Sequence, residues 1–422
     1  MIRLAFGSVP KDGGTFTFYR NMRPALLQHG IDMRCVAVGP SQAAIWEDSF
    51  ADDGCLLLAP KTDSLKAQAQ AFAAWCDSEQ IDIVFGVNSP AILSSLPHLP
   101  QKIRAMARCA NGFDEGYRLT MMCHERLAKI VALVPRLRDD LIADYGAEID
   151  SIVLIPNGAS ADRFDAAAAK ERGVSERLEL GFLGRLEHTQ KGVLHLPPVL
   201  ERLDKAGIEY RLSIAGKGKH DAELRASFTQ HIVDGSVRFV GTLTPNEIPS
   251  FLSEIDCFLF PSHFEGCPNA LLEAMMAGTA PVAWRLPGIT DFLLDDGRTG
   301  ILAPKGDVDG FSEAIIALAT NRVRLRRICS DGAKAARASY STETCRDRYV
   351  ALLNEVVSKA PPSWTPRSWS EFKIDPLFRP RPLARLIPAR QRRILRSLSE
   401  SVQKRRLSPS TKEVPRVDRP CV

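Results

Sequence analysis

The sequence predicts a soluble α/β protein made of two Rossmann-like domains, each a doubly wound parallel sheet. Short apolar runs of strand length alternate with helical stretches along most of the chain, which is the pattern of parallel sheets. The length of 422 residues exceeds one ordinary domain and suggests two. A hydrophobic fraction of 45% and a charged fraction of 25% are typical of a globular protein. No run approaches the roughly 18 to 20 apolar residues of a membrane span.

The first domain is expected over residues 1–165. It begins with a strand at 2–7, a glycine turn at 11–14 and a helix at 15–29. Further strand-like runs lie at 33–38, 56–58, 81–87, 105–110, 130–134 and 151–155. The helical stretches between them include 64–76 and 136–145.

The second domain, expected over residues 176–340, repeats the alternation. Its strands are predicted near 178–183, 210–215, 237–240, 257–260, 280–283 and 301–302. We place the boundary in 165–175, which is small, polar and without a strand pattern. A helix near 341–358, in a terminal segment over 341–360, is expected to end the fold.

The cysteines and the N-terminus favour a cytoplasmic protein. Ten cysteines are scattered along the chain without a Cys-x-x-Cys pair, so neither a zinc ribbon nor a disulfide scaffold is indicated. Residues 1–7 are too short for a signal peptide and lead straight into a strand and a glycine turn.

Residues 361–422 form a basic tail rich in proline and arginine. They hold fifteen Lys or Arg and five Asp or Glu, a net charge of +10. The whole chain has a net charge of +5, so the rest of the chain carries −5. A basic amphipathic helix at 391–407 would gain about 1 kcal/mol per Lys or Arg on an anionic membrane. Its apolar stripe would be Ile394, Leu395, Leu398 and Val402. The alternative is a largely disordered extension. No nucleic-acid partner is expected, because the tail lacks interleaved aromatic residues.

Glu265 and Glu273 are the most informative pair of residues in the chain. The apolar run 257–261 ends just before Glu265, and a helix opened by Pro268 and capped by Asn269 follows. The N–H groups and the dipole of a helix N-terminus attract phosphate, and two carboxylates beside it accept hydrogen bonds from hydroxyl groups. The combination suits a sugar attached to a nucleotide diphosphate. The alternative is an ordinary capped helix with a solvated glutamate.

Two cations follow the strand-like run at 178–183. Gly184 and Arg185 end the run, and Lys191 lies six positions after the arginine. An Arg and a Lys on a loop that leaves a parallel strand can clamp a pyrophosphate, the Arg through its planar fork and the Lys as a point charge. Ligands of open α/β sheets bind at the carboxyl ends of strands, which favours this role. Two surface cations on a turn are the alternative.

Together these motifs resemble the donor half of glycosyltransferase family 4, over residues 176 to 334. The resemblance rests on their order: Gly-Arg…Lys-Gly at 184–192, Ala-Gly-Lys-Gly at 215–218, Val-Gly-Thr-Leu at 240–243, then the two glutamates. Ile-Pro-Asn-Gly at 155–158 is similar to the segment before the interdomain linker of that family. The resemblance implies a retaining, nucleotide-sugar-dependent enzyme of GT-B fold. Its two domains would face a cleft, and its last helix would cross back to the first domain.

The resemblance also implies the site residues. Arg185 and Lys191 are catalytic candidates because they would stabilise charge on the departing diphosphate, and Glu265 because it would hold donor-sugar hydroxyls. Glu273 is expected to bind the ribose hydroxyls. The base is expected beside residues 241–243. The remaining donor-binding candidates are Gly13, Gly14, Asn111, Gly184, Lys217, Thr242, Leu243, Gly266, Cys267, Pro268, Asn269 and Ala270.

Two places in the first domain depart from known patterns. Gly13 and Gly14 follow the first strand, but the fingerprint Gly-x-Gly-x-x-Gly is absent, which argues against a dehydrogenase. The resemblance implies a turn whose backbone approaches the donor, and a tight turn that needs positive φ is the alternative. Asn111 stands where many family members carry a histidine that contacts the donor sugar. Its amide can bond a hydroxyl but cannot carry a proton, and His124 is not expected to replace it.

No carboxylate of the first domain is singled out as a nucleophile. Asp12, Asp114 and Glu115 are present, but none lies in a distinctive context. The resemblance therefore implies a front-face route, in which the diphosphate leaves, the acceptor attacks from the same side and a phosphate oxygen helps to remove its proton. No metal and no other cofactor is expected, because no Asp-x-Asp lies in a metal-binding context and two cations neutralise the diphosphate.

The sequence thus predicts a retaining glycosyltransferase that transfers a hexose from a nucleotide diphosphate sugar to a glycan or lipid-linked acceptor. The expected setting is bacterial surface polysaccharide or glycolipid biosynthesis, in the cytoplasm or on the inner membrane face through the 361–422 tail. The alternatives are a GT-B enzyme of another reaction type, such as an epimerase or a phosphorylase, and a non-catalytic binding protein. The presence of both cations and both glutamates argues against the last alternative. The absence of an obvious pyridoxal phosphate lysine argues against a phosphorylase.

Overall fold

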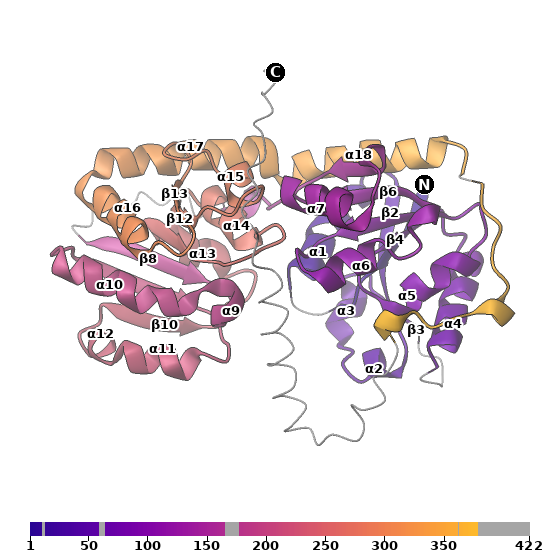
Figure 1. Ribbon diagram of the computed structural model, residues 1–422, viewed down its shortest axis with the longest axis horizontal. Coiled ribbons are helices and arrows are strands. Elements are labelled where there is room, and N and C mark those ends of the chain that lie inside the picture. The colour runs from indigo at the N-terminus through magenta and orange to yellow at the C-terminus, as the bar shows by residue number, and fades with distance from the viewer. Residues whose placement is uncertain (11–12, 59–63, 165–176, 362, 379–422) are drawn as a thin grey trace. The chain divides into compact units, whose positions relative to one another are not determined.

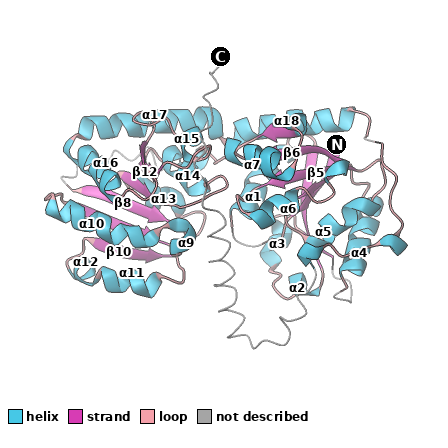
Figure 2. Ribbon diagram, in the orientation of Figure 1, coloured by secondary structure: helices cyan, strands magenta, loops and turns pink. Residues whose placement is uncertain are grey.

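Two parallel β-sheets, each flanked by helices, form the centres of two α/β domains (Figure 1; Figure 2). The computed structural model describes residues 1–10, 13–58, 64–164, 177–361 and 363–378. The segment 165–175, where we place the domain boundary, lies outside these residues.

The first sheet has seven strands in the order β3-β2-β1-β4-β5-β6-β7, and all neighbours are parallel. The strands are β1 (Ile2–Gly7), β2 (Ile31–Val38), β3 (Leu56–Leu58), β4 (Ile83–Gly86), β5 (Arg104–Cys109), β6 (Leu127–Ala132) and β7 (Ile152–Leu154). The α-helices are α1 (Gly14–Leu27), α2 (Pro40–Ala43), α3 (Asp48–Asp52), α4 (Leu65–Ser78), α5 (Pro90–Ser95), α6 (Asp114–Thr120) and α7 (Pro135–Tyr145). Short 3₁₀ helices are η1 (Leu96–His98), η2 (His124–Arg126) and η3 (Ile149–Ser151).

The second sheet has six strands in the order β10-β9-β8-β11-β12-β13, again all parallel. The strands are β8 (Leu178–Leu183), β9 (Tyr210–Ala215), β10 (Val237–Gly241), β11 (Cys257–Phe260), β12 (Ala280–Trp284) and β13 (Ile301–Ala303). The helices of this half begin with α9 (His188–Lys191), η4 (Val193–His195), α10 (Leu196–Lys205), α11 (Asp221–Ser227), α12 (Thr229–Val233) and α13 (Ile248–Ser253). They continue with α14 (Asn269–Met276), α15 (Thr290–Leu293), α16 (Val308–Thr320), α17 (Arg322–Tyr340) and α18 (Thr342–Ser358).

Strand β11 shows why the central strands read as continuous apolar runs. Its side chains alternate between the two faces of the sheet. Cys257 and Leu259 lie in one buried cluster, together with residues of α10 and α16. Phe258 and Phe260 lie in another, together with residues of α14. Because helices cover both faces of a parallel sheet, no residue of the strand faces water.

All thirteen strands expected from the sequence are present. The largest shift is in β6, which starts at Leu127 instead of residue 130. The buried Arg126 anchors that start, because its guanidinium donates to the carbonyls of Leu99 (2.9 Å), Pro100 (2.8 Å) and Ile103 (2.9 Å). His124 begins a one-turn 3₁₀ helix, η2.

In each sheet the chain order reverses between two central strands, β1 and β4 in the first and β8 and β11 in the second. Loops that leave the carboxyl ends of such strands diverge and leave room for a ligand. The loops after β8 and β11 carry Arg185 and Glu265, and the Gly13–Gly14 turn follows β1. The topology therefore gathers the predicted residues at the ligand-binding edges of the sheets.

The last long helix, α18, packs on the first domain. The Tyr349 ring lies 5.3 Å from the ring of Phe18 on α1 and 6.1 Å from that of Phe85 on β4, measured between ring centroids. The fold does not end there, contrary to expectation. The 3₁₀ helix η5 (Trp369–Glu371) follows, and the Trp369 ring stacks on His98 at 4.2 Å. An aromatic stack of this kind holds residues that composition alone assigns to the tail.

Beyond Phe372 the structure describes residues 373–378, which include the 3₁₀ helix η6 (Pro376–Phe378). The predicted amphipathic segment at 391–407 lies outside the described residues. Within the part of the chain that is described, every helix is too short or too polar to cross a membrane.

Candidate functional site

An ion pair joins the two loops at the switch point of the second sheet. Lys191 Nζ lies 2.6 Å from Glu265 Oε1, and the side chains are only 16% and 7% exposed. Gln190 Nε2 donates to the other carboxylate oxygen at 3.4 Å. A carboxylate this deeply buried needs such partners, since an isolated buried charge is costly. Two of the three predicted catalytic residues are thus in direct contact.

A single helical turn, α9, positions Lys191. Glu187 caps the turn and accepts hydrogen bonds from the backbone N–H groups of Thr189 and Gln190, both at 2.8 Å. Lys219 also pairs with Glu187, at 2.9 Å. Burial alone would raise the pKa of Glu187, but the hydrogen bonds from Lys219 and Thr189 outweigh it and lower the pKa to about 2. The cap therefore stays charged at neutral pH.

Gly192 brings the two loops together at the end of α9. Its φ is 65°, and a Cβ at this position would overlap with the carbonyl oxygen of Pro261. Only glycine combines the left-handed conformation with this close approach. The loop after β8 is therefore pressed against the loop after β11.

Arg185, the third predicted catalytic residue, is exposed, and its guanidinium donates to the side-chain carbonyl of Gln190. A Cβ at Gly184 would lie 3.7 Å from Lys191 Cε, so Gly184 lies beside the lysine side chain. Lys217 is also exposed, and its carbonyl accepts the N–H of Leu186 at 3.0 Å. The cations thus surround the start of the β8 loop, with Arg185 and Lys217 open to solvent.

Helix α14 begins one residue earlier than its predicted cap implies. Pro268 is the N-cap, and Asn269 is the first helical residue rather than the cap. The Asn269 side chain instead accepts a hydrogen bond from Asn157 Nδ2 at 2.6 Å. A local pattern could not reveal this, because the partner lies 112 residues earlier in the chain. Ala270 is the second residue of the helix.

Glu273 lies further along α14 with 7% of its surface exposed. Burial raises the pKa of this carboxyl group, and the charge of Arg163 lowers it only in part. The fold thus holds a carboxylate in an environment that disfavours its charge. Hydrogen bonds from hydroxyl groups would stabilise the ionised form.

Asn157 and Arg108 are site residues that the sequence reasoning did not assign. Asn157 Nδ2 donates to Cys267 O at 3.1 Å, and Arg108 donates to Asn157 Oδ1 at 2.5 Å. Arg108 is 2% exposed, and its guanidinium lies 4.0 Å from the centroid of the Phe18 ring. The chain thereby ties the start of α14 to β5. The Ile-Pro-Asn-Gly segment was the available signal for Asn157.

Three backbone approaches bring the first domain to the same place. A Cβ at Gly266 would overlap with the carbonyl oxygen of Ala110, and one at Gly112 would lie 3.2 Å from Glu265 O. Asn111 therefore lies beside the Glu265 loop. A Cβ at Gly14 would lie 3.6 Å from Asn269 Nδ2, so the glycine turn meets the start of α14. Gly13 has φ 148° and caps α1.

The residues expected near the base follow β10. Thr242 is exposed, and Leu243 is partly buried against the core. Gly216 N donates to Gly241 O at 2.7 Å, and a Cβ at Gly216 would overlap with the carbonyl oxygen of Gly184. The loops after β8, β9 and β10 therefore lie side by side.

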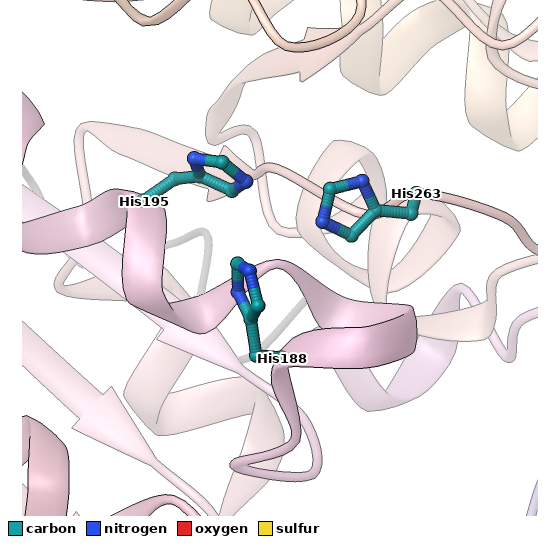
Figure 3. A group of neighbouring side chains, drawn as sticks. All are labelled: His188, His195 and His263. Carbon is teal, nitrogen blue, oxygen red and sulfur yellow. The ribbon is translucent and has the colours of Figure 1, made fainter. Parts of the chain in front are cut away.

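Three histidines form a cluster beside these loops that the sequence reasoning missed (Figure 3). His188 begins α9, His195 ends η4, and His263 lies two residues before Glu265. Burial, with the nearby His188, lowers the pKa of His195 to about 4, and burial lowers that of His188 as well. His188 and His195 lie in the connection between β8 and α10, and His263 lies in the loop after β11, so only the fold brings the three together.

Comparison with known proteins matches residues 177–321 to the family of glycosyl transferases group 1. The chain is 30% identical over 174 residues to 2-deoxystreptamine glucosyltransferase of Streptomyces kanamyceticus, which is 39% of this chain and 45% of that protein. It is 32% identical over 179 residues to glycogen synthase of Mycobacterium tuberculosis, 42% of each chain. The match thus spans less than half the length of either relative.

Among solved structures, HepE of Anabaena in complex with UDP and glucose aligns with a TM-score of 0.68. The alignment covers 84% of this chain and 100% of that one at 16% sequence identity. Identity this low shows a shared fold.

Proposed function

The chain belongs to glycosyltransferase family 4, the group 1 enzymes of GT-B fold, and we propose that it transfers a hexose from a nucleotide diphosphate sugar to an acceptor. The acceptor is a glycan or a lipid-linked glycan, as in bacterial surface polysaccharide or glycolipid assembly. The transfer retains the anomeric configuration. Enzymes of this family use nucleotide sugars and are independent of metal.

One observation carries the proposal: the Lys191–Glu265 ion pair lies at the switch point of the second sheet, next to the start of α14. This edge offers a cation, a carboxylate and a helix N-terminus to the donor. Lys191 and Arg185 bind the diphosphate, Glu265 binds the sugar hydroxyls, and Glu273 binds the ribose. Backbone groups of 266–269 and the amide of Asn111 complete the sugar site, since both segments lie beside Glu265.

The chemistry is electrostatic. As the bond between sugar and diphosphate breaks, negative charge grows on the phosphate oxygens, and cations held in place beforehand stabilise it without reorganisation. Lys191 is held by Glu265 at 2.6 Å and by the α9 turn, so its position is fixed before the donor arrives. The acceptor then attacks the same face, and a phosphate oxygen takes its proton.

The side chains of the first domain support a route without a carboxylate nucleophile. Asp114 and Glu115 lie exposed in the first turn of α6. Asp114 Oδ1 accepts a hydrogen bond from the Tyr145 hydroxyl at 2.9 Å, and Asp114 Oδ2 lies 3.8 Å from Arg118 Nη1. A carboxylate engaged in this way is a poor nucleophile. Asp12 lies outside the described residues.

A turnover assay tests the proposal. Purified protein is incubated with UDP-, GDP-, ADP- and CMP-sugars and a mixed set of glycan acceptors, and release of free nucleotide is followed together with the product. We expect one nucleotide class to be consumed and the product linkage to keep the donor configuration by nuclear magnetic resonance. The Lys191→Met variant should lose about 10²–10³-fold in rate, as for other charge-stabilising donors.

A matched lysine variant controls for general damage. Lys205 lies at the exposed end of α10, and Lys205→Met should keep the wild-type rate. An inverted product would contradict the front-face route. Binding of a nucleotide sugar without any product would favour the non-catalytic alternative.

A further inference from the structure

We propose that His188, His195 and His263 bind a divalent cation of the late first row, with Zn²⁺ as the best match. Each residue offers one ring nitrogen, and the three nitrogens lie within 4.8 Å of one another. In Figure 3 the three rings point toward a common space, from separate segments of the second domain. Imidazole nitrogen suits zinc, copper and nickel, and three histidines with one open position form a known zinc arrangement.

The geometry needs only side-chain movement. Zinc–nitrogen bonds of about 2.0–2.1 Å in a tetrahedron place ligand nitrogens about 3.4 Å apart. The widest separation in the cluster therefore has to close by at most about 1.4 Å, which ring rotation can supply. All three residues are partly exposed, so the cluster lies near the protein surface.

Unsatisfied polar atoms around the cluster point to a ligand. His195 Nε2 is buried and has no hydrogen-bond partner among the described residues. Trp284 is 1% exposed, and its ring centroid lies 4.5 Å from that of His195 and 5.1 Å from that of His263. The Trp284 indole N–H likewise has no partner within the described chain. An ion would satisfy the His195 nitrogen, and the indole could donate to a water or anion that completes the coordination.

His188 would lose a hydrogen bond when it binds the ion. Its Nδ1 accepts the backbone N–H of Leu194 at 3.2 Å. That hydrogen bond is lost whichever nitrogen binds the ion, because Nδ1 then holds either the metal or a proton. We therefore expect His188 to be the weakest of the three ligands and His195 the strongest.

The position gives the ion a structural role. His263 N donates to Gln190 O at 2.7 Å, and both Gln190 and Lys191 contact Glu265. An ion on the three histidines would join α9, η4 and the loop after β11, the segments that carry this ion pair. No step of the proposed transfer passes through it. The inference does not rest on the proposed function, because metal binding is measured in the absence of nucleotide.

Calorimetric titration tests the proposal with Zn²⁺ alone, on full-length protein without a histidine tag and stripped with a chelator. We expect one ion per chain. His195→Gln and His263→Gln should each weaken binding at least about tenfold, comparable to or larger than the effect of losing an outer-shell partner. His124→Gln is the matched control, since His124 has a side chain 60% exposed and lies outside the cluster.

Two results would overturn the inference: no stoichiometric zinc binding, or binding that His195→Gln and His263→Gln leave unchanged, which is an adventitious ion only. If both variants fail to fold, X-ray absorption of the zinc-loaded wild type decides, because it counts the ligands directly. Three imidazole nitrogens support the site, and fewer contradict it. A protein that binds nucleotide but not zinc would refute this inference while leaving the proposed function intact.

Discussion

At Glu273 the charged form of the carboxyl group, which ligand hydroxyls would bind, is the form that burial destabilises. Burial raises the pKa of its carboxyl group, so the folded protein favours the neutral form. Below the unfolded pKa, near 4.3, both states are protonated and nothing is lost. As pH rises through the folded pKa, the buried group must ionise, and stability falls. Bound ribose hydroxyls would reverse this by donating to the charged form.

We therefore expect Glu273→Gln to raise the free energy of unfolding at about pH 8 and to leave it unchanged at about pH 4. The same variant should bind nucleotide more weakly, because a neutral amide is a poorer acceptor for hydroxyl groups. Urea titrations at the two pH values measure the first effect. Glu313→Gln, at an exposed position of α16, is the control and should change neither quantity. A destabilised Glu273→Gln protein at high pH would contradict the interpretation.

Because Lys191 and Glu265 form a buried ion pair, replacing one partner should destabilise the protein more than replacing both. Lys191→Met should cost about 3–5 kcal/mol in urea unfolding, because it leaves Glu265 buried with Gln190 as its remaining partner. Adding Glu265→Gln should recover most of that stability, since two neutral side chains need no charge partner. Activity should stay low in both proteins. If the double variant is no more stable than the single one, the pair is not held as a buried ion pair.

At the level of single elements, a comparison of two glycines distinguishes the effect of a left-handed backbone from that of a close backbone contact. Gly192 and Gly207 have nearly the same φ, 65° and 67°. A Cβ at Gly192 would overlap with Pro261 O, whereas nothing lies within 4 Å of one at Gly207. Gly207→Ala should therefore cost about 1–2 kcal/mol for the left-handed backbone alone.

Gly192→Ala should cost clearly more than Gly207→Ala, and it should also lower nucleotide affinity, because the loops after β8 and β11 must separate. Thermal unfolding and nucleotide titration of both variants provide the comparison. Equal losses of stability, with affinity retained, would show that the approach of Gly192 to Pro261 does not shape the site.

The sequence predicted those elements best that have the most regular surroundings. Strands such as β8 and β11 are buried on both faces, so a continuous apolar run marks their ends. The start of β6 was misplaced because a buried arginine, not an apolar residue, sets it. The cap of α14 was misassigned because Asn269 bonds to Asn157 in another domain. The histidine cluster was missed since it joins the connection after β8 to the loop after β11, and long-range contacts leave no local pattern.

At the scale of the whole molecule, the chain returns to its first domain twice. Helix α18 places Tyr349 against Phe18, and the segment before Phe372 stacks Trp369 on His98. Arg367 N also donates to Pro97 O at 2.9 Å. A truncation that tests the tail should therefore cut after residue 378 and keep these contacts.

We expect deletion of 379–422 to leave thermal stability and nucleotide affinity unchanged and to abolish binding to anionic vesicles. Residues 361–422 carry a net charge of +10 whereas the rest of the chain carries −5, and each cation near the headgroups contributes about 1 kcal/mol. Flotation with vesicles of anionic and of neutral lipid measures this, and added salt should release the full-length protein. Equal flotation of the two proteins would show that the tail is not a membrane anchor.

We propose that the second domain binds the nucleotide of a sugar donor between Lys191, Glu265 and Glu273. Calorimetric titration of wild type, Glu273→Ala and the control Glu313→Ala with UDP, GDP, ADP and CMP measures this binding. We expect one nucleotide to bind wild type and the control equally, and to bind Glu273→Ala at least about tenfold more weakly, a loss of about 1.4 kcal/mol. Equal affinity of all three proteins, or no binding of any nucleotide, would contradict it.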